Sequence, residues 1–409
     1  MPASFPIFER VELAPRDPIL GLNEAFAADP RVSKVNLGVG VYYDEHGRIP
    51  LLEAVRRAEQ ARLKSPHPRG YLPIDGLASY DAAVQQLLFG ADAEPVASGR
   101  VVTIQALGGT GALKVGADFL RRHVPTVRAI ISNPSWENHR ALFESAGFEV
   151  TAYPYYDPSS HGIDFAGMAQ ALADAEPNTV VVLHACCHNP TGVDLSLEQW
   201  RELVDIIKHR ALIPFLDIAY QGFGESLHED AIAVRLLANA EVPVFIASSF
   251  SKSFSLYGER VGALTIVTAN RDEATRVLSQ VKRLIRTNYS NPPTHGAAIV
   301  ASILRDADLR ALWERELAGM RDRIKAMRER LVDGLRRHGV PRDFSFLLRQ
   351  RGMFSYTGLT PEQVERLRRE YGIYAVATGR ICVAALNTSN IEYVCGALAS
   401  VLEDSTVSL

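Results

Sequence analysis

Residues 244–267 of this 409-residue chain read VFIASSFSKSFSLYGERVGALTIV. Two apolar runs, Val244–Ser248 and Gly262–Val267, lack the alternation of polar and apolar residues that is typical of a half-exposed strand. We therefore predict that both are strands covered on both faces of a sheet. Between them lies a serine-rich loop that carries one lysine, Lys252, and an arginine eight residues later, Arg260.

Five runs of the same kind occur earlier in the chain, at Arg100–Ala106, Ala129–Ser132, Val150–Tyr153, Thr179–His184 and Ile213–Leu216. Helical patterns separate them, at Thr110–Arg122, Trp136–Ala146, Phe165–Ala173, Ser196–His209 and Ala231–Asn239. Strands that alternate with helices predict a largely parallel sheet with helices on both faces. The expected fold class is α/β with a seven-stranded sheet, and ligands of such sheets bind at the carboxyl ends of the strands.

The pattern changes after Asn270, where helical periodicity dominates and runs through Leu309–Leu335. Gly339 and Pro341 are ordinary stop signals for this helix. The tail returns to mixed strands and helices through Met353–Tyr356 and Ile391–Leu402. We predict a large α/β domain at 51–320, a smaller α+β lobe built from 16–50 and 321–409, and an N-terminal arm at 1–15.

The overall charge is close to neutral, at −3 from 44 basic and 47 acidic residues. A basic surplus for nucleic acid or an anionic membrane is lacking, so an anionic ligand must be bound by local arginines. The first residues show no signal-peptide pattern, and no apolar run approaches the roughly 18 residues of a membrane span. The four cysteines form no CxxC pair. We expect a cytoplasmic protein that binds neither nucleic acid nor a membrane, and we predict no metal site.

The loop around Lys252 offers the chemistry of an imine-forming lysine beside a phosphate site. Such a lysine must lose its charge, and shielding from water together with nearby cations lowers its pKa toward that state. Ser249, Ser251 and Arg260 are the donors that a bound phosphate requires. The segment also suits an ordinary loop with a solvated lysine, so it does not decide the function alone.

Two further strand ends carry candidate site residues. Asp217 follows a buried run, where it could cap a helix or pair with a cationic ring nitrogen such as that of pyridoxal. The turn at Gly108–Gly111 leads from a strand into a helix, whose free N–H groups could bind phosphate, although glycines at such turns are often purely geometric. Trp136 could stack on a planar cofactor or belong to the core.

These motifs occur in the order GGTG (108–111), NPSWENH (133–139), HNPTG (188–192), DIAYQGF (217–223), SFSKSF (249–254), RTNYSNPP (286–293) and TGRICVAALN (378–387). The order resembles the aspartate/aromatic amino-acid aminotransferase family, within the fold-type I pyridoxal-phosphate enzymes. The resemblance spans nearly the whole chain. It implies pyridoxal 5′-phosphate as the cofactor, and amino acids and 2-oxo acids as substrates.

The resemblance also implies a role for each matching residue. Lys252 would bind the cofactor as an imine and move a proton between the substrate Cα and the cofactor. Asp217, backed by His139, would stabilise the protonated ring nitrogen. The remaining cofactor contacts would be Tyr220 and Asn189 at the phenolic oxygen, Trp136 on the ring, and Gly109, Thr110, Ser249, Ser251 and Arg260 at the phosphate.

For the substrate, the resemblance implies that Arg380 binds the α-carboxylate, helped by Asn189 and the backbone of Gly40. Tyr71 would reach the phosphate of a neighbouring subunit, and Arg286 would bind the distal carboxylate of a dicarboxylate there. The expected assembly is a homodimer with shared active sites.

The expected reaction transfers the amino group of tyrosine, phenylalanine and aspartate to 2-oxoglutarate by a ping-pong mechanism. Leu107, Tyr42-Tyr43 and the run Gln350–Leu359 resemble the bacterial aromatic aminotransferases, whereas Asn291 is more similar to the aspartate branch. The alternative is mainly an aspartate aminotransferase. Arg286 must swing away or stay hydrated when an aromatic ring enters, because burying it unpaired costs several kcal/mol.

Two rival interpretations stay open at this point. A pyridoxal enzyme could instead carry out β-elimination, decarboxylation or racemisation, but a pair of carboxylate-binding arginines favours transamination. A non-catalytic regulator would need a basic DNA-binding module, and the residues before 51 show neither a helix-turn-helix pattern nor a basic cluster. We also predict cis peptide bonds at Asn133-Pro134 and Asn189-Pro190.

Overall fold

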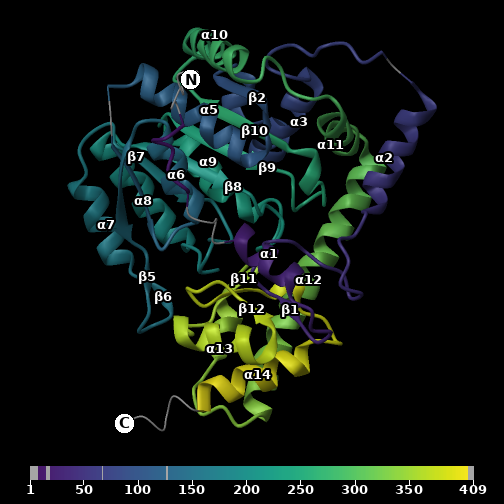
Figure 1. Cartoon of the computed structure of the whole chain (residues 1–409). Coiled ribbons are helices and arrows are strands. Elements are labelled where there is room, and N and C mark those ends of the chain that lie inside the picture. The colour runs from purple at the N-terminus through teal and green to yellow at the C-terminus, as the bar shows by residue number, and fades with distance from the viewer. Residues whose placement is uncertain (1–7, 15–18, 67, 126–127, 404–409) are drawn as a thin grey trace, which may run out of the picture.

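The structure, a computed structural model, describes residues 8–14, 19–66, 68–125 and 128–403. All seven predicted strands are present in one sheet, in the order β2-β10-β9-β8-β7-β3-β4 (Figure 1). Their bounds are β2 Val101–Leu107, β3 Arg128–Asn133, β4 Glu149–Pro154, β7 Val180–His184, β8 Ile213–Ile218, β9 Val244–Ser249 and β10 Val261–Val267. Only β10 runs antiparallel to its neighbours in this sheet. The predicted α/β class with a mostly parallel seven-stranded sheet is confirmed.

Helices cover both faces of this sheet. One face packs against α5 (Gly108–His123), α6 (Glu137–Ser145) and α10 (Arg271–Asn288), and the other against α3 (Ala78–Phe89), α7 (Phe165–Asp174), α8 (Leu197–Arg210), α9 (Ile232–Asn239) and α11 (His295–Arg305). Successive side chains of a strand point to opposite faces. In β7, Val181 and Leu183 join one core while Val180 and Val182 join the other. Because both faces are covered, these strands show no polar alternation.

The C-terminal part forms a smaller lobe below the sheet in Figure 1. It contains the paired strands β11 (Phe354–Tyr356) and β13 (Arg380–Cys382), with α13 (Pro361–Tyr371) and α14 (Ile391–Glu403). Strand β12 (Ile373–Tyr374) pairs with β1 (Val35–Asn36), so an N-terminal segment contributes to this lobe. The long helix α12 (Ala307–Arg337) continues through residues 320 and 321 without a break. The domain boundaries at 50/51 and 320/321 therefore stay a prediction.

The remaining elements are short or lie at the periphery. They are α1 Leu20–Ala28, α2 Glu53–Lys64, α4 Glu94–Ala97, β5 Tyr156–Asp157, β6 Gly162–Ile163, and the 3-10 helices η1 Glu229–Ala231, η2 Tyr257–Glu259, η3 Ser345–Arg349 and η4 Val383–Ala385. Both predicted cis peptide bonds are confirmed. Among the described residues, no helix combines the length and the apolar character needed to cross a membrane.

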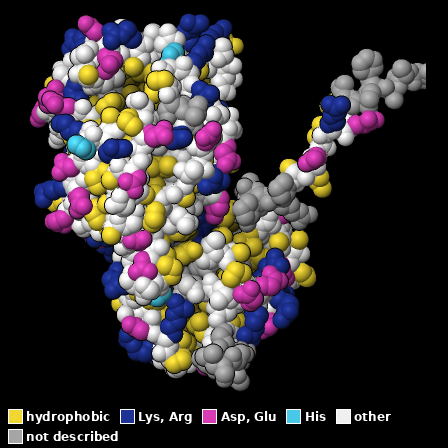
Figure 2. Space-filling model, turned by 90° about the vertical axis from the view of Figure 1, so that its left-hand side faces the viewer, with side chains coloured by type: hydrophobic (Ala, Val, Ile, Leu, Met, Phe, Trp, Pro, Cys, Tyr) yellow, Lys and Arg dark blue, Asp and Glu magenta, His cyan; other side chains and the backbone are white. Residues whose placement is uncertain are grey.

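The predicted N-terminal arm is described only at residues 8–14, and positions 16–18 of the predicted small lobe lie outside the described residues. Figure 2 shows the described stretch projecting away from the body of the molecule. Phe8, Val11 and Leu13 on this stretch are largely exposed. Basic and acidic side chains are interspersed on the face that Figure 2 shows.

Candidate active site

A cavity of about 280 Å³ lies at the carboxyl ends of the central strands, beside β11 and β13 of the smaller lobe. Ligands of open α/β sheets bind at this edge. All the predicted site residues except Tyr71 and Arg286 line it, namely Gly40, Gly109, Thr110, Trp136, Asn189, Asp217, Tyr220, Ser249, Ser251, Lys252, Arg260 and Arg380. Residues that are far apart in the sequence therefore share one pocket.

Lys252 lies just beyond β9 and is partly buried. Burial, with smaller contributions from the positive charges of Arg260 and Arg380, lowers the pKa of Lys252 to about 8, although Asp217 opposes the shift. Its Nζ atom lies 4.8 Å from the centroid of the Tyr220 ring. Near neutral pH, roughly a tenth of such an amine is uncharged, compared with about one in three thousand for an ordinary lysine. The solvated-lysine interpretation is therefore not favoured.

Asp217 is a member of strand β8 and caps no helix. Its Oδ2 atom lies 2.8 Å from Nε2 of His139, whose Nδ1 lies 2.9 Å from Ser135 Oγ. Burial opposes ionisation of Asp217, but the hydrogen bond from His139 and the charge of Lys252 outweigh it and hold the pKa of this carboxyl below its ordinary value. Asp217 thus presents a carboxylate to the cavity, which suits a cationic ring nitrogen.

The N-terminus of α5 meets the loop after β9 and forms a candidate phosphate site. The N–H of Gly108 donates to the carbonyl of Arg260 at 2.9 Å. No side chain caps α5, so the next N–H groups, those of Gly109 and Thr110, can bind an anion. Arg260 Nη1 donates to Ser251 Oγ at 3.4 Å, and Ser251, Ser249 and Thr110 all line the cavity. The combination of helix end, hydroxyls and guanidinium fits a phosphate group.

Two glycines allow this turn to pack against the loop. Gly108 has φ +68, a left-handed conformation, and an added Cβ would lie 2.5 Å from Arg260 Nη2. An added Cβ at Gly262 would lie 2.3 Å from the backbone carbon of Gly108. Gly108 needs glycine because of its left-handed φ, and Gly262 needs it because an added Cβ would lie against the backbone of Gly108. The glycines at this turn are thus required by the close contact that builds the candidate phosphate site.

Arg380 reaches the opposite side of the cavity from β13. Its side chain is 2% exposed, and it donates to Asn189 Oδ1 at 2.9 Å and to the carbonyl of Gly38 at 2.7 Å. Its Nε atom is buried without a hydrogen-bond partner in the described part of the chain, and no described carboxylate forms an ion pair with it. A buried guanidinium with an unused donor suits a carboxylate ligand.

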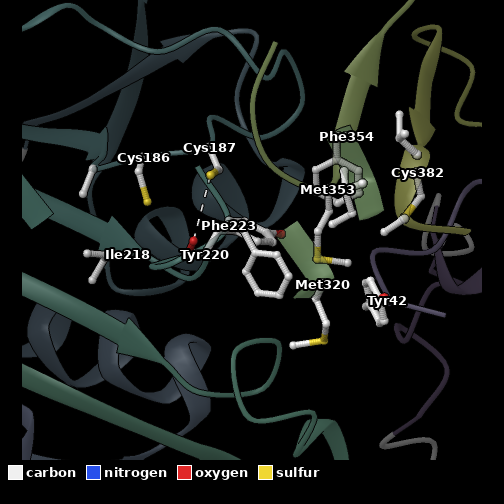
Figure 3. Close-up of a cluster of buried hydrophobic side chains, with 14 of the residues drawn as sticks. Tyr42, Cys186, Cys187, Ile218, Tyr220, Phe223, Met320, Met353, Phe354 and Cys382 are labelled. Carbon is white, nitrogen blue, oxygen red and sulfur yellow. Dashed lines mark hydrogen bonds between the residues drawn. The ribbon is translucent and has the colours of Figure 1, made fainter. Parts of the chain in front are cut away.

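Apolar side chains support this side of the cavity. The ring of Phe354 lies under Arg380, with 4.3 Å between the guanidinium carbon and the ring centroid, and meets the Tyr220 ring edge-on at 5.9 Å. Figure 3 shows Tyr220 and Cys187, from the loops that follow β8 and β7, facing Met353 and Phe354, from the smaller lobe. Tyr220 and Phe354 are both buried at this contact.

Tyr71 and Arg286 lie outside this cavity. Tyr71 is 94% exposed and lies in the connection between α2 and α3. Arg286 is exposed near the end of α10, where it donates to the hydroxyl of Ser290. Both positions are compatible with contacts to a neighbouring subunit, as the resemblance implies.

The sequence interpretation missed six residues that line the cavity, namely Ile19, Leu113, His184, Ala219, Tyr257 and Phe354. His184 ends β7, its Nε2 atom is buried without a partner among the described residues, and burial lowers its pKa to about 3. Tyr257 accepts a hydrogen bond from the backbone of Tyr42 at 2.9 Å. Phe354 lies beneath Arg380. The position of His184 at a strand end could have identified it, whereas Tyr257 and Phe354 depend on tertiary packing.

A comparison with protein families matches residues 32–398 to the family described as aminotransferase class I and II. The chain belongs to this family. The predicted aminotransferase is thereby confirmed. Among curated relatives, the chain is 64% identical to the aspartate aminotransferase of Pseudomonas aeruginosa and 51% identical to the aromatic-amino-acid aminotransferase of Escherichia coli; in each case the match covers 97% of this chain and 100% of the relative.

Among solved structures, the chain is similar to the aromatic-amino-acid aminotransferase of Burkholderia pseudomallei covalently bound to pyridoxal phosphate. The TM-score is 0.95 and the identity 67%, with 97% of this chain and 99% of the other covered. This agreement confirms the predicted fold-type I architecture. The relatives carry both aspartate and aromatic names, so their names alone do not decide the preferred donor of this chain.

Proposed function

We propose that this class I and II aminotransferase uses pyridoxal 5′-phosphate to transfer the amino group of tyrosine, phenylalanine and aspartate to 2-oxoglutarate in a ping-pong reaction. One observation carries the proposal: Lys252, Asp217 and Arg380 line a single cavity, in which the pKa of Lys252 is lowered by burial and that of Asp217 is lowered, in spite of burial, by the hydrogen bond from His139. The uncapped end of α5 and Arg260 add the phosphate site that the cofactor requires.

Bound pyridoxal phosphate supplies an electron sink for the bonds at the substrate Cα. Asp217 would keep the proton on the ring nitrogen, since its carboxylate stays ionised beside His139. Lys252 Nζ would hold the cofactor, and as a free amine it would accept the proton from the substrate Cα. The lowered pKa of Lys252 makes the uncharged amine accessible near neutral pH.

Tyr220 and Asn189 orient the cofactor and substrate. Burial raises the pKa of the Tyr220 phenol, so it stays protonated and would donate a hydrogen bond to the phenolic oxygen of the cofactor. The Asn189 side chain accepts a hydrogen bond from Arg380 and thereby fixes the guanidinium that binds the α-carboxylate. Trp136 and the backbone of Gly40 complete the walls against which the planar groups lie.

We further propose a homodimer in which Tyr71 and Arg286 complete the neighbouring active site. Tyr71 is almost fully exposed although it is aromatic, and Leu13 on the projecting N-terminal stretch is fully exposed. Such side chains are typical of surfaces that another chain covers. The four cysteines are free and buried, which supports a reducing cytoplasm as the place of action.

The choice between aromatic acids and aspartate depends on whether Arg286 can move away from the substrate side chain. Within the described residues, the exposed guanidinium donates only to the hydroxyl of Ser290, so it can move when a ring enters. This supports use of both donor classes. The alternative, mainly an aspartate aminotransferase, is supported by the name of the Pseudomonas aeruginosa relative.

A visible absorption spectrum of the purified protein tests the proposal directly. We expect a cofactor band that bleaches with L-tyrosine and with L-aspartate and returns with 2-oxoglutarate. Bleaching with aspartate alone would establish the alternative. Absence of a cofactor band after supply of pyridoxal phosphate would contradict the proposal.

A further inference from the structure

Gln105 is a buried polar residue that the roles described above leave unused. It lies on the edge strand β2, three residues before the phosphate-site glycine Gly108, and its side chain is 2% exposed. Burying an amide is unfavourable unless its donors and acceptors are bonded. The partners of Gln105 therefore indicate what this amide holds in place.

Gln105 bonds to two separate connections of the chain. Its backbone N–H donates to the carbonyl of Asp75 at 2.9 Å, and its side-chain oxygen accepts from the N–H of Leu77 at 3.3 Å. Its side-chain nitrogen donates to the carbonyl of Pro293 at 2.5 Å. A single amide thus ties the connection between α2 and α3 to the connection between α10 and α11.

Close packing and an ion pair reinforce the same junction. Gly76 has φ +99, and an added Cβ would lie 2.4 Å from Gln105 Cβ, so the α2–α3 connection rests directly on β2. Lys282 of α10 lies 3.0 Å from the carboxylate of Asp75. Figure 1 shows β2 between α10, where one of these connections begins, and α3, where the other ends. The position of each connection therefore depends on the other.

Each of these connections carries or adjoins one residue that is proposed to act in the other subunit. Tyr71 lies in the α2–α3 connection, and Arg286 lies at the end of α10 beside Ser290. Resting on the proposed function, we infer that Gln105 is a positioning residue that sets Tyr71 and Arg286 for the active site of the neighbouring subunit. Its amide acts on the partner's chemistry and touches no reacting atom.

A role in its own active site is the competing possibility, because Gln105 also precedes the turn at Gly108–Thr110 on the same strand. The two roles differ in which of the two active sites is impaired when Gln105 is replaced. In the proposed role, a change impairs the site that receives Tyr71 and Arg286. In the competing role, it impairs the site that contains Lys252 of the same chain.

The first test uses Gln105→Leu as a homodimer. We expect the KM for 2-oxoglutarate to rise about fivefold and kcat to stay within about twofold, because a lost hydrogen bond loosens groups that bind the substrate uniformly. Gln105→Asn, which keeps a buried amide but withdraws it from Pro293, should give a smaller rise in KM. Gln85→Leu is the matched control, since Gln85 bonds the β2 side chain Thr103 but touches neither connection. We expect that control to behave like the wild type.

The decisive test uses hybrid dimers, purified with two different tags, in which Lys252→Ala inactivates one site. In the first hybrid, Gln105→Leu and Lys252→Ala are on the same chain, so the working site receives Tyr71 and Arg286 from the altered chain. In the second hybrid, Gln105→Leu is on the chain that keeps Lys252. We expect a raised KM in the first hybrid and a wild-type KM in the second, with Gln105→Asn giving the same pattern.

The reverse pattern, or equal KM values in both hybrids, would overturn the positioning role while leaving the proposed function intact. A hybrid of wild-type and Lys252→Ala chains serves as the reference, and about half of the wild-type activity is expected for it. An inactive wild-type dimer would overturn the proposed function itself. A monomeric wild-type chain that is fully active would overturn the positioning role in trans and leave the transaminase assignment standing.

Discussion

The guanidinium carbon of Arg380 lies 4.3 Å from the centroid of the Phe354 ring, so a residue of β11 packs beneath a residue of β13. A cationic guanidinium over an aromatic face gains roughly 0.5–2 kcal/mol. Gly40 lacks a side chain at the place where an added Cβ would lie 2.8 Å from the Phe354 ring. The ring can therefore reach Arg380 only because position 40 is glycine.

Replacing this ring should weaken substrate binding without removing the chemistry. For Phe354→Leu we expect roughly a three- to tenfold rise in the KM of every amino-acid substrate, because the α-carboxylate is common to all of them. Steady-state kinetics with tyrosine and aspartate measures this. Phe344→Leu is the control. The guanidinium carbon of Arg342 lies 5.2 Å from the centroid of the Phe344 ring, and this pair does not line the cavity. A rise confined to one substrate would contradict the role assigned to Phe354.

Arg328 should stabilise the strand that carries Phe354. It is buried at 3% exposure, burial lowers its pKa to about 10, and it donates to the carbonyls of Gly352 and Phe354 and to Ser355 Oγ. Arg328→Met leaves these acceptors unpaired, so we expect a loss of about 2–4 kcal/mol in the free energy of unfolding, measured by urea denaturation. The exposed neighbour Arg330→Met should change it little. Equal losses of stability in Arg328→Met and Arg330→Met would show that Arg328 does not stabilise the strand that carries Phe354.

Replacing Arg286 should separate the two donor classes. Arg286→Leu removes a charged partner for the distal carboxylate, so kcat/KM for aspartate should fall about a hundredfold and that for tyrosine only a few-fold. Arg283→Leu, on an exposed position of the same helix, is the control. Equal losses on both donors would show that Arg286 does not discriminate between the classes.

The fold could be predicted from the sequence because buried strands leave a clear signal. The seven runs of apolar residues are continuous, since side chains on both faces of β7 and its neighbours enter a core. The direction of β10 could not be predicted, because the apolar pattern is the same in a parallel and an antiparallel strand. The pairing of β1 with β12 involves two residues on each strand, too few to give a periodic pattern.

The site was predictable where chemistry and spacing coincide, as at Lys252 and Asp217. The placement of Asp217 inside β8 removes the helix-cap interpretation that the sequence had left open. Gln105 and Phe354 could not be assigned roles, because their partners lie in distant segments. The contacts that join the α2–α3 connection to α10 and to the residues after it can be identified only from the structure.

The pKa of Lys252 predicts a pH dependence for cofactor capture. The uncharged amine attacks the aldehyde, so the rate at which cofactor-free protein binds pyridoxal phosphate should rise with pH and level off above about 8. Stopped-flow absorbance between pH 6 and 10 measures it, and Lys252→Ala should abolish the signal. A midpoint near the ordinary lysine value of 10.5 would show that Lys252 is not shielded in this way.

Gly262 should be indispensable for the phosphate site although it touches no ligand. The Cβ of Gly262→Ala would meet the backbone of Gly108 at 2.3 Å, and a backbone atom cannot move aside as a flexible side chain can. The start of α5 must then separate from Arg260 and Ser249. We expect a loss of about 1–3 kcal/mol in stability from overpacking and at least a tenfold weaker affinity for pyridoxal phosphate, measured by fluorescence titration of the cofactor-free protein.

Gly258→Ala is the matched control, because nothing lies within 4 Å of its added Cβ. If Gly262→Ala binds the cofactor as tightly as Gly258→Ala does, the contact between Gly108 and Gly262 does not hold the phosphate site together.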